Sequence, residues 1–152
     1  MERAEIEWDY PDPFILEVAV QEADIDSFGH VNNANYLRWL TECAWAHSAH
    51  VGLSESVCVA LRRGMAVRTV QLDLLLATYL GDQLLVGNWL TAVTRLRATR
   101  VYQIVNVATG DTVLRGQVGF VCMNLDTGQA TRMPPEFVAG YGDSACGDVD
   151  TG

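Results

Sequence analysis

One long stretch of the chain has helical periodicity, and it limits the folds that the chain can adopt. Between residues 34 and 50, apolar or weakly polar side chains recur at helical spacing, so that Tyr36, Leu40, Cys43, Ala44 and His47 share one face. Arg38 and Glu42 share another face at i,i+4 spacing. A helix of this length extends roughly 25 Å at 1.5 Å per residue, which is enough to span a small sheet.

Most of the remaining sequence has the pattern of strands. A short strand is expected at residues 14–20 and a second, shorter helix at residues 54–63, ended by Gly64. Further strands are expected at residues 65–77, 83–96, 101–109 and 112–124, and Gly110-Asp111 predicts a tight hairpin between the last two. One strand, one long helix and a run of antiparallel strands predict an α+β protein with the helix on the sheet.

The chain is expected to form one domain over residues 1–141. Its 152 residues suffice for one core, and no repeat or linker divides them. Residues 1–13 are acidic and contain Pro11 and Pro13, which predicts a loose lead-in. Residues 142–152 follow a Gly-, Ala- and Asp-rich stretch and are expected to form a disordered acidic tail.

The charge of the chain argues against two classes of partner. Nineteen acidic and ten basic residues give a net charge of −9. Nucleic acids and anionic membranes both require a basic surface, so neither is expected as a partner. No apolar run approaches the ~20 residues of a membrane-spanning helix, and the acidic start does not resemble a secretory signal. We therefore expect a soluble, cytoplasmic protein.

The cysteines and the basic residues exclude some chemistry. Cys43, Cys58, Cys122 and Cys146 are widely spaced and form no CxxC pair, so reduced thiols are expected in place of disulfides or a zinc site. All ten basic residues are arginine. Without lysine, the chain cannot form a Schiff base or a lysine-containing phosphate loop.

The densest group of polar residues lies just before the long helix, within residues 24–36. It includes two carboxylates, Asp24 and Asp26, together with His30 and three asparagines. A carboxylate can act as base or nucleophile, a histidine can position or transfer a proton, and helix-start amides can stabilise an oxyanion. The alternative is a capped loop whose polar side chains only satisfy backbone groups, with Asn33 as the helix N-cap.

The stretch DIDSFGHVNNANYLRWLTECAW resembles the signature of hotdog-fold acyl thioesterases. The core of the match is Asp-x-x-x-His-Val-Asn-Asn-x-x-Tyr, which runs here from Asp26 to Tyr36. It is most similar to the long-chain acyl-CoA and acyl-ACP thioesterases, and more distantly to the 4-hydroxybenzoyl-CoA thioesterase group. A weaker match covers FVCMNLDTGQA at residues 120–130. The resemblance implies a hotdog fold, an antiparallel sheet wrapped around one long helix.

The resemblance also implies roles for individual residues. Asp26 takes the position of the catalytic base or nucleophile, His30 supports it, and the helix-start amide at Asn33 donates to the thioester carbonyl. Asn32 and Tyr36 belong to the same motif and are assigned to substrate binding, in structural roles. No metal or other cofactor is required.

Two departures from the family pattern and one group of arginines concern the substrate. Phe28 replaces an asparagine of the acyl-ACP branch, and Leu74-Leu75-Leu76-Ala77 replaces an aromatic-x-x-Pro sequence. The first bears on the catalytic set and the second on the acyl pocket or dimer edge. Arg95, Arg97 and Arg100 are expected near a hairpin, where they either meet the phosphates of coenzyme A or form a solvated turn.

We therefore expect hydrolysis of an acyl thioester, carried on coenzyme A or on an acyl carrier protein, to free acid and thiol. The resemblance implies a homodimer or homotetramer. Two alternatives remain open, namely an enoyl- or hydroxyacyl-thioester hydratase or dehydratase and a non-catalytic acyl-binding module. The sequence leaves the acyl chain, its carrier and the pathway undetermined.

Overall fold

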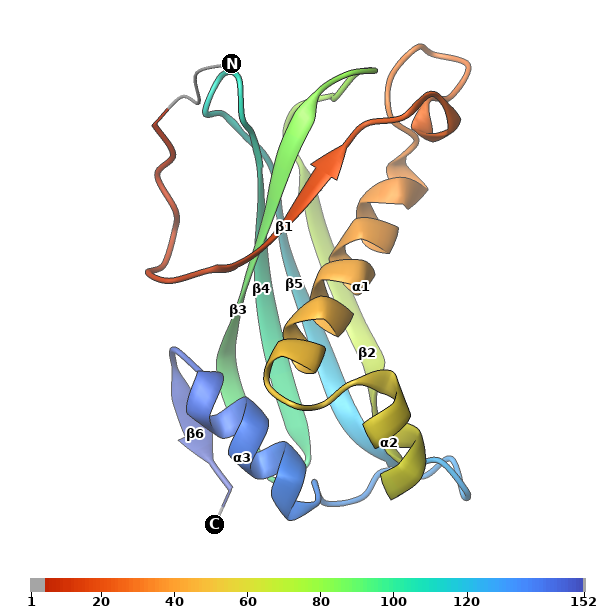
Figure 1. The fold of residues 1–152 in the computed structure, drawn as a ribbon, viewed down its shortest axis with the longest axis vertical. Coiled ribbons are helices and arrows are strands. Elements are labelled where there is room, and N and C mark those ends of the chain that lie inside the picture. Colours follow the sequence, from red (N-terminus) through yellow and green to blue (C-terminus); the bar gives the residue numbers. More distant parts are fainter. Residues whose placement is uncertain (1–4, 152) are drawn as a thin grey trace. The chain divides into compact units, whose positions relative to one another are not determined.

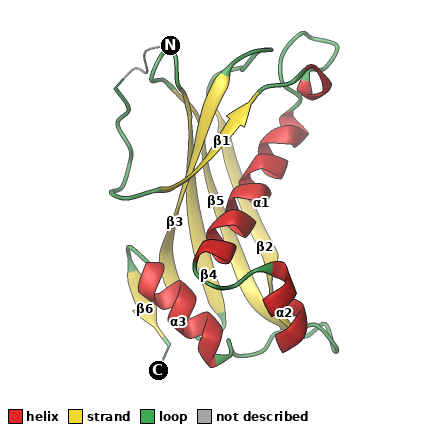
Figure 2. Ribbon diagram, in the orientation of Figure 1, coloured by secondary structure: helices red, strands yellow, loops and turns green. Residues whose placement is uncertain are grey.

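The computed structural model of the protein describes residues 5–151. Along the chain, Figure 1 follows the order β1 (Phe14–Ala19), η1 (Glu22–Asp24), α1 (Asn33–His50), α2 (Glu55–Leu61), β2 (Arg63–Leu74), β3 (Gln83–Thr94), β4 (Arg97–Asn106), β5 (Thr112–Asn124), α3 (Pro135–Ser144) and β6 (Asp148–Asp150). Figure 2 colours the same elements by type. The predicted long helix and five predicted strands are confirmed, whereas α3 and β6 were not expected.

The strands form one sheet, in which five of them follow the order β1-β3-β4-β5-β2. The sixth strand, β6, also pairs with β3 and is not part of this order. β1 and β3 are antiparallel, from the pair Phe14–Asn88 to the pair Ala19–Gln83. β6 is the exception to the antiparallel prediction, because it runs parallel to β3. This arrangement confirms the predicted α+β class.

The chain divides into two compact units, and each is described by itself. The first contains the residues up to Ala44 together with Leu72–Asn88 and Tyr102–Gly116. The second contains Trp45–Gln71, Trp89–Val101 and the residues from Gln117 onward. α1 and β2 to β5 contribute residues to both.

In the first unit, α1 packs on the sheet with the face that its periodicity predicts. Tyr36, Leu40 and Cys43 are buried. The Cys43 thiol donates to the Val86 carbonyl at 3.5 Å and accepts from the Asn88 side-chain Nδ2 at 3.0 Å, which connects the helix to β3. On the exposed side, Arg38 and Glu42 lie 3.6 Å apart as the spacing predicts.

The lead-in is held more firmly than the sequence indicates. Residues 1–4 of the expected loose segment lie outside the described residues, but the Asp9 amide donates to Gln103 Oε1 at 2.9 Å and the Asp9 carboxylate pairs with Arg115 at 2.8 Å. Trp8 lies against Gly87 so closely that a Cβ there would be 2.6 Å from the ring. The described part of the segment therefore packs on the sheet.

In the second unit, an apolar core joins α2, α3 and the strands. It contains the buried residues Leu53, Cys58, Leu90, Val93, Ala98, Cys122, Met133, Phe137 and Tyr141. Phe137 is completely buried, which explains why α3 is held in place although its sequence is rich in glycine and small residues.

Disorder was expected from residue 142, whereas the structure ends α3 at Ser144 and places β6 beside β3. The Cys146 amide donates to the Leu90 carbonyl at 2.8 Å, and a Cβ on Gly147 would overlap the Thr91 backbone. The glycine that suggested disorder is thus the residue that permits this close approach.

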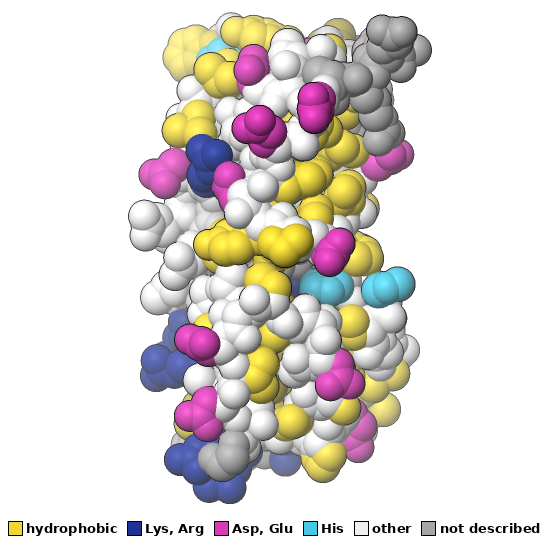
Figure 3. Space-filling view, turned by 90° about the vertical axis from the view of Figure 1, so that its left-hand side faces the viewer, with side chains coloured by type: hydrophobic (Ala, Val, Ile, Leu, Met, Phe, Trp, Pro, Cys, Tyr) yellow, Lys and Arg dark blue, Asp and Glu magenta, His cyan; other side chains and the backbone are white. Residues whose placement is uncertain are grey.

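On the face drawn in Figure 3, acidic side chains are scattered among apolar and uncharged ones. No helix in the described part of the chain is long and apolar enough to cross a membrane.

Candidate functional site

The residues that resemble a catalytic motif lie on a short loop before α1, which we call the Asp26 loop (residues 25–31). Ile25 and Val31 form an antiparallel bridge, and the Asp26 amide donates to the His30 carbonyl at 3.0 Å. Gly29 has a φ of 85°, a conformation that glycine adopts at little cost. The loop is therefore a closed turn that holds Asp26 and His30 at neighbouring positions.

The Asp26 carboxylate is only half-buried and is oriented by its own backbone. One oxygen accepts a hydrogen bond from the Phe28 amide at 2.8 Å. The other oxygen has no hydrogen-bond or ion-pair partner among residues 5–151. A carboxylate held by one oxygen and open at the other can take a proton from water or attack a carbonyl carbon.

His30 lies on the returning side of the Asp26 loop. Its Nδ1 is 3.3 Å from the Val31 carbonyl, and because a carbonyl only accepts, Nδ1 carries a proton. In the neutral ring this tautomer leaves a lone pair on Nε2. The centroid of the imidazole is 6.1 Å from that of the Phe28 ring and 6.5 Å from that of the Tyr79 ring. No hydrogen bond between the described side chains joins His30 to Asp26.

The start of α1 differs in one detail from the sequence prediction. Asn33 is the first helical residue, and the capping role falls to Asn32, whose side-chain oxygen accepts from the Ala34 amide at 3.0 Å. The Asn32 carbonyl accepts from the Asn35 amide. Within the described chain, the Asn33 amide is left without an acceptor, so it can donate to a developing negative charge at the positive end of the helix dipole.

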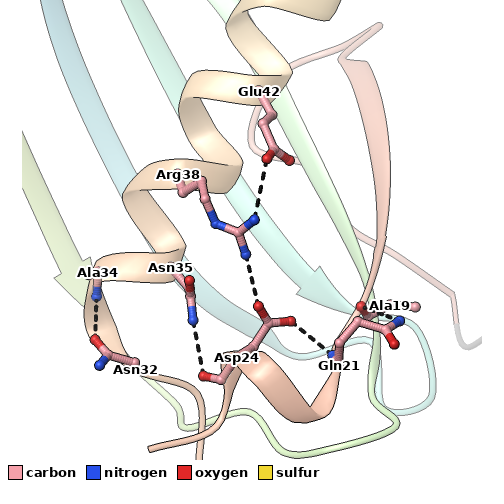
Figure 4. A network of polar contacts seen from close by, with 8 residues as sticks. All are labelled: Ala19, Gln21, Asp24, Asn32, Ala34, Asn35, Arg38 and Glu42. Atoms are coloured by element: carbon pink, nitrogen blue, oxygen red, sulfur yellow. Dashed lines mark hydrogen bonds and ion pairs between the residues drawn. The ribbon is translucent and has the colours of Figure 1, made fainter.

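Asp24 is a structural residue whose role the sequence did not show. Its side chain is 8% exposed, and its carboxylate pairs with Arg38 at 2.8 Å and accepts from the Gln21 amide at 2.8 Å. The Asp24 carbonyl accepts from the Asn35 side chain at 3.0 Å, so this residue joins η1 to the start of α1 (Figure 4). Both of its carboxylate oxygens are engaged, unlike those of Asp26.

Tyr36 lies inside the molecule. Its hydroxyl is 2.7 Å from Thr78 Oγ1, and both side chains are buried. Burial raises the pKa of Tyr36 above its ordinary value. Thr78 is absent from the motif, and nothing in the sequence around it marks it as a partner of Tyr36.

The three arginines predicted as phosphate contacts do not form one cluster. Arg95 and Arg97 are exposed at the turn between β3 and β4, whereas Arg100 is buried within β4. Arg100 belongs to a separate group, the Arg100 cluster (His47, Ser48, Arg100 and Tyr141). Its burial removes Arg100 from the surface where a phosphate could meet it directly.

The Arg100 cluster is closed by hydrogen bonds in the second unit. The guanidinium donates to His47 Nδ1 at 2.7 Å and to Ser48 Oγ at 3.1 Å, and Ser48 Oγ is 3.0 Å from the Tyr141 hydroxyl. Arg100 also lies 5.7 Å from the centre of the Tyr141 ring. Because a guanidinium only donates, His47 Nδ1 is the acceptor and carries no proton.

A groove of about 530 Å³ runs between β1 and α1 in the first unit. Asp24, Arg38 and Glu42 line it, but neither Asp26 nor His30 does, so it is separate from the candidate site. Within the described residues, no group of three or more His, Cys, Asp or Glu side chains is placed to hold a metal ion.

Comparison with protein families places most of the chain in one of them. Residues 20–140 match the model described as the thioesterase-like superfamily. No curated protein matches the sequence significantly.

Solved structures share the fold at low sequence identity. A 1,4-dihydroxy-2-naphthoyl-CoA thioesterase from Synechocystis is 22% identical, with a TM-score of 0.79 over 87% of this chain and 97% of its own. A DHNA-CoA thioesterase from Staphylococcus aureus is 20% identical, with a TM-score of 0.79 over 85% and 88%. Another S. aureus protein, solved in complex with CoA, is 19% identical, with a TM-score of 0.80 over 95% and 90%. The predicted hotdog fold is confirmed.

Proposed function

Because the chain belongs to the thioesterase-like superfamily, we propose that it hydrolyses an acyl thioester to a free acid and a thiol. The observation that carries the proposal is the Asp26 carboxylate, which is held through one oxygen by the Phe28 amide and is open at the other. The Asn33 amide at the start of α1 supplies a donor for the thioester oxygen. In this proposal, Asp26 supplies the base or nucleophile and Asn33 supplies the oxyanion donor.

In the proposed reaction, the open oxygen of Asp26 takes a proton from water while the water oxygen bonds to the thioester carbon. The carbonyl oxygen becomes negative and accepts from the Asn33 amide, where the dipole of an 18-residue helix favours negative charge. The carbon–sulfur bond then breaks, and the thiolate takes up a proton. Alternatively, an Asp26 oxygen bonds to the carbonyl carbon, the carbon–sulfur bond breaks and the thiolate leaves to take up a proton. Water then hydrolyses the resulting anhydride to the free acid and the Asp26 carboxylate.

His30 has a supporting role in this proposal. With Nδ1–H directed to the Val31 carbonyl, its Nε2 lone pair can orient the attacking water or accept a proton. We assign it a smaller share of the rate than Asp26, because no hydrogen bond among the described residues couples the two side chains.

Coenzyme A is the thiol carrier that we propose. The solved structures with this fold include CoA thioesterases and one protein with CoA bound, which supports the assignment by similarity. Arg95 and Arg97 are exposed and remain candidates for contacts with its phosphates. We further propose a homodimer or homotetramer, because Leu74, Leu75 and Leu76 are 45–49% exposed at the end of an outer strand.

The proposal is tested by measuring thiol release from a panel of aliphatic and aromatic acyl-CoA thioesters and from acyl carrier protein thioesters. Release from at least one CoA thioester, ranked by kcat/KM, is the expected result. A change in enoyl absorbance without thiol release would instead establish a hydratase or dehydratase. Binding without turnover across the whole panel would establish an acyl-binding module.

A further inference from the structure

We propose that Thr78, in the turn between β2 and β3, is a positioning residue for the candidate site. The inference rests on the proposed function, since it concerns how Asp26, His30 and the Asn33 amide are held for that reaction. Thr78 contacts the motif at two separate points, one through its backbone and one through its side chain.

The backbone contact holds the Asp26 loop. The Thr78 carbonyl accepts from the Val31 amide at 2.9 Å, and Val31 is the residue that bridges to Ile25. Asp26 follows Ile25 directly, and His30 precedes Val31. A single hydrogen bond therefore links Thr78 to the Ile25–Val31 bridge that closes the loop.

The side-chain contact holds the start of α1. Thr78 Oγ1 lies 2.7 Å from the Tyr36 hydroxyl, and Tyr36 is in the first turn of the helix, three residues after Asn33. Thr78 is 0% and Tyr36 3% exposed, so water cannot replace either hydroxyl in this bond. The same residue thus holds both the carboxylate loop and the oxyanion donor.

The turn that carries Thr78 is itself anchored. The Tyr79 amide donates to the Asp82 carboxylate at 2.9 Å, and the Asp82 carbonyl accepts from Val20, just after β1, at 2.9 Å. The Tyr79 ring meets the His30 imidazole edge-on at 87°, a third contact between this turn and the motif. A turn fixed to β1 in this way can keep the helix start and the loop in register.

Replacing Thr78 by valine tests the inference, because valine keeps the shape and the backbone bond but removes the hydroxyl. We expect kcat to fall about tenfold with KM within about twofold, since small displacements of reacting groups are costly. Thr78→Ser restores the hydroxyl and should restore kcat. Thr112→Val is the matched control, because it removes another threonine hydroxyl of the same unit, which accepts from Gln103 at 2.9 Å away from the motif.

The double variant Tyr36→Phe with Thr78→Val separates positioning from stability. It leaves no unpaired buried hydroxyl, so its melting temperature should recover relative to Thr78→Val, while kcat stays low. Recovery of kcat together with the melting temperature would overturn the inference, and so would an unchanged kcat in folded Thr78→Val.

A spectroscopic measurement distinguishes failure of the inference from failure of the proposed function. The chain has three histidines, so the His30 ring resonance can be assigned by NMR. We expect this resonance to shift in Thr78→Val and to stay in place in Thr112→Val. Absence of thioesterase activity in the unmodified protein would refute the proposed function alone, whereas an unshifted His30 resonance in Thr78→Val would refute the inference.

Discussion

The Asp26 loop and the Arg100 cluster are both polar, but they differ in how completely their groups are satisfied. In the Arg100 cluster, a buried guanidinium, an imidazole and two hydroxyls bond to one another. In the Asp26 loop, one carboxylate oxygen has no hydrogen-bond donor within the described chain. The amide of Asn33, at the neighbouring start of α1, has no acceptor there. Polar groups that are closed on each other stabilise a fold, whereas polar groups left open can act on a substrate.

Burial gives the same contrast. Arg100 is 3% exposed, and no buried side-chain nitrogen or oxygen of the described residues lacks a hydrogen bond. Phe28, which holds the Asp26 carboxylate through its amide, is 83% exposed. The comparison therefore predicts that substitutions in the Asp26 loop change the rate, and that substitutions in the Arg100 cluster change the stability.

The largest effect is expected from Asp26→Asn, which keeps the shape of the side chain but removes its basicity. Steady-state kinetics with the best acyl-CoA substrate should show kcat lower by at least ~100-fold, as for loss of a general base. Thermal unfolding should be nearly unchanged, because one oxygen remains to accept from the Phe28 amide.

Glu22→Gln is the matched control for Asp26→Asn, since it removes an exposed carboxylate from the same segment. Asp24→Asn is unsuitable for this purpose, because Asp24 is buried and paired with Arg38. If folded Asp26→Asn retains more than about a tenth of the original kcat, the assignment of the catalytic carboxylate is wrong.

Arg100→Met tests the other side of the comparison. It removes a charged donor from His47 and Ser48, and we expect urea unfolding to show a loss of about 2 kcal/mol. The KM of the folded variant for acyl-CoA should stay unchanged. Arg97→Met, at an exposed position of β4, is the paired measurement and should raise KM with little loss of stability. The reverse pattern would return Arg100 to the substrate-binding residues.

His30→Ala is expected to have a smaller effect, with kcat lower by about tenfold, because His30 supports the reaction without bonding to Asp26. The ring is partly exposed, so the melting temperature should change little. Steady-state kinetics of the variant with the best acyl-CoA substrate check the assignment. Loss of activity as large as that of Asp26→Asn would make His30 an equal partner in the reaction.

The smallest effect concerns alkaline stability. Burial raises the pKa of Tyr141, and the same holds for Tyr36. A raised pKa in the folded state contributes stability below the unfolded pKa of about 10, and this contribution is lost as the pH rises further.

The chain contains no lysine, so tyrosines and thiols dominate titration in this range, and burial also raises the pKa of Cys58 and Cys122. Urea unfolding between pH 9 and 11 should show a shallower loss in Tyr141→Phe, by on the order of 1 kcal/mol. Equal slopes in the two proteins would mean that Tyr141 ionises as easily in the folded state as in the unfolded state.

The comparison also shows how far the sequence could predict the site. The resemblance to the thioesterase motif could be seen in the sequence, because its residues from Asp26 to Tyr36 lie within one loop and one helical turn. It could not separate Arg100 from Arg95 and Arg97, since alternation along a strand assigns a residue to a face and does not identify what covers that face.

The sequence by itself determined the long helix, the strands β1 to β5 and the motif, because helical and strand periodicity and the order of residues in a loop are local properties. It did not determine α3 and β6, which are held by packing on the rest of the second unit. Only the tertiary structure decided which polar groups bond to one another and which keep a donor or acceptor available for a substrate. Thr78 meets Tyr36 across 42 residues, and Arg100 meets His47 across 53. Such pairs depend on how the sheet and the helix pack, because packing brings distant segments together. It also excludes the water that would otherwise form hydrogen bonds with the polar groups of these residues.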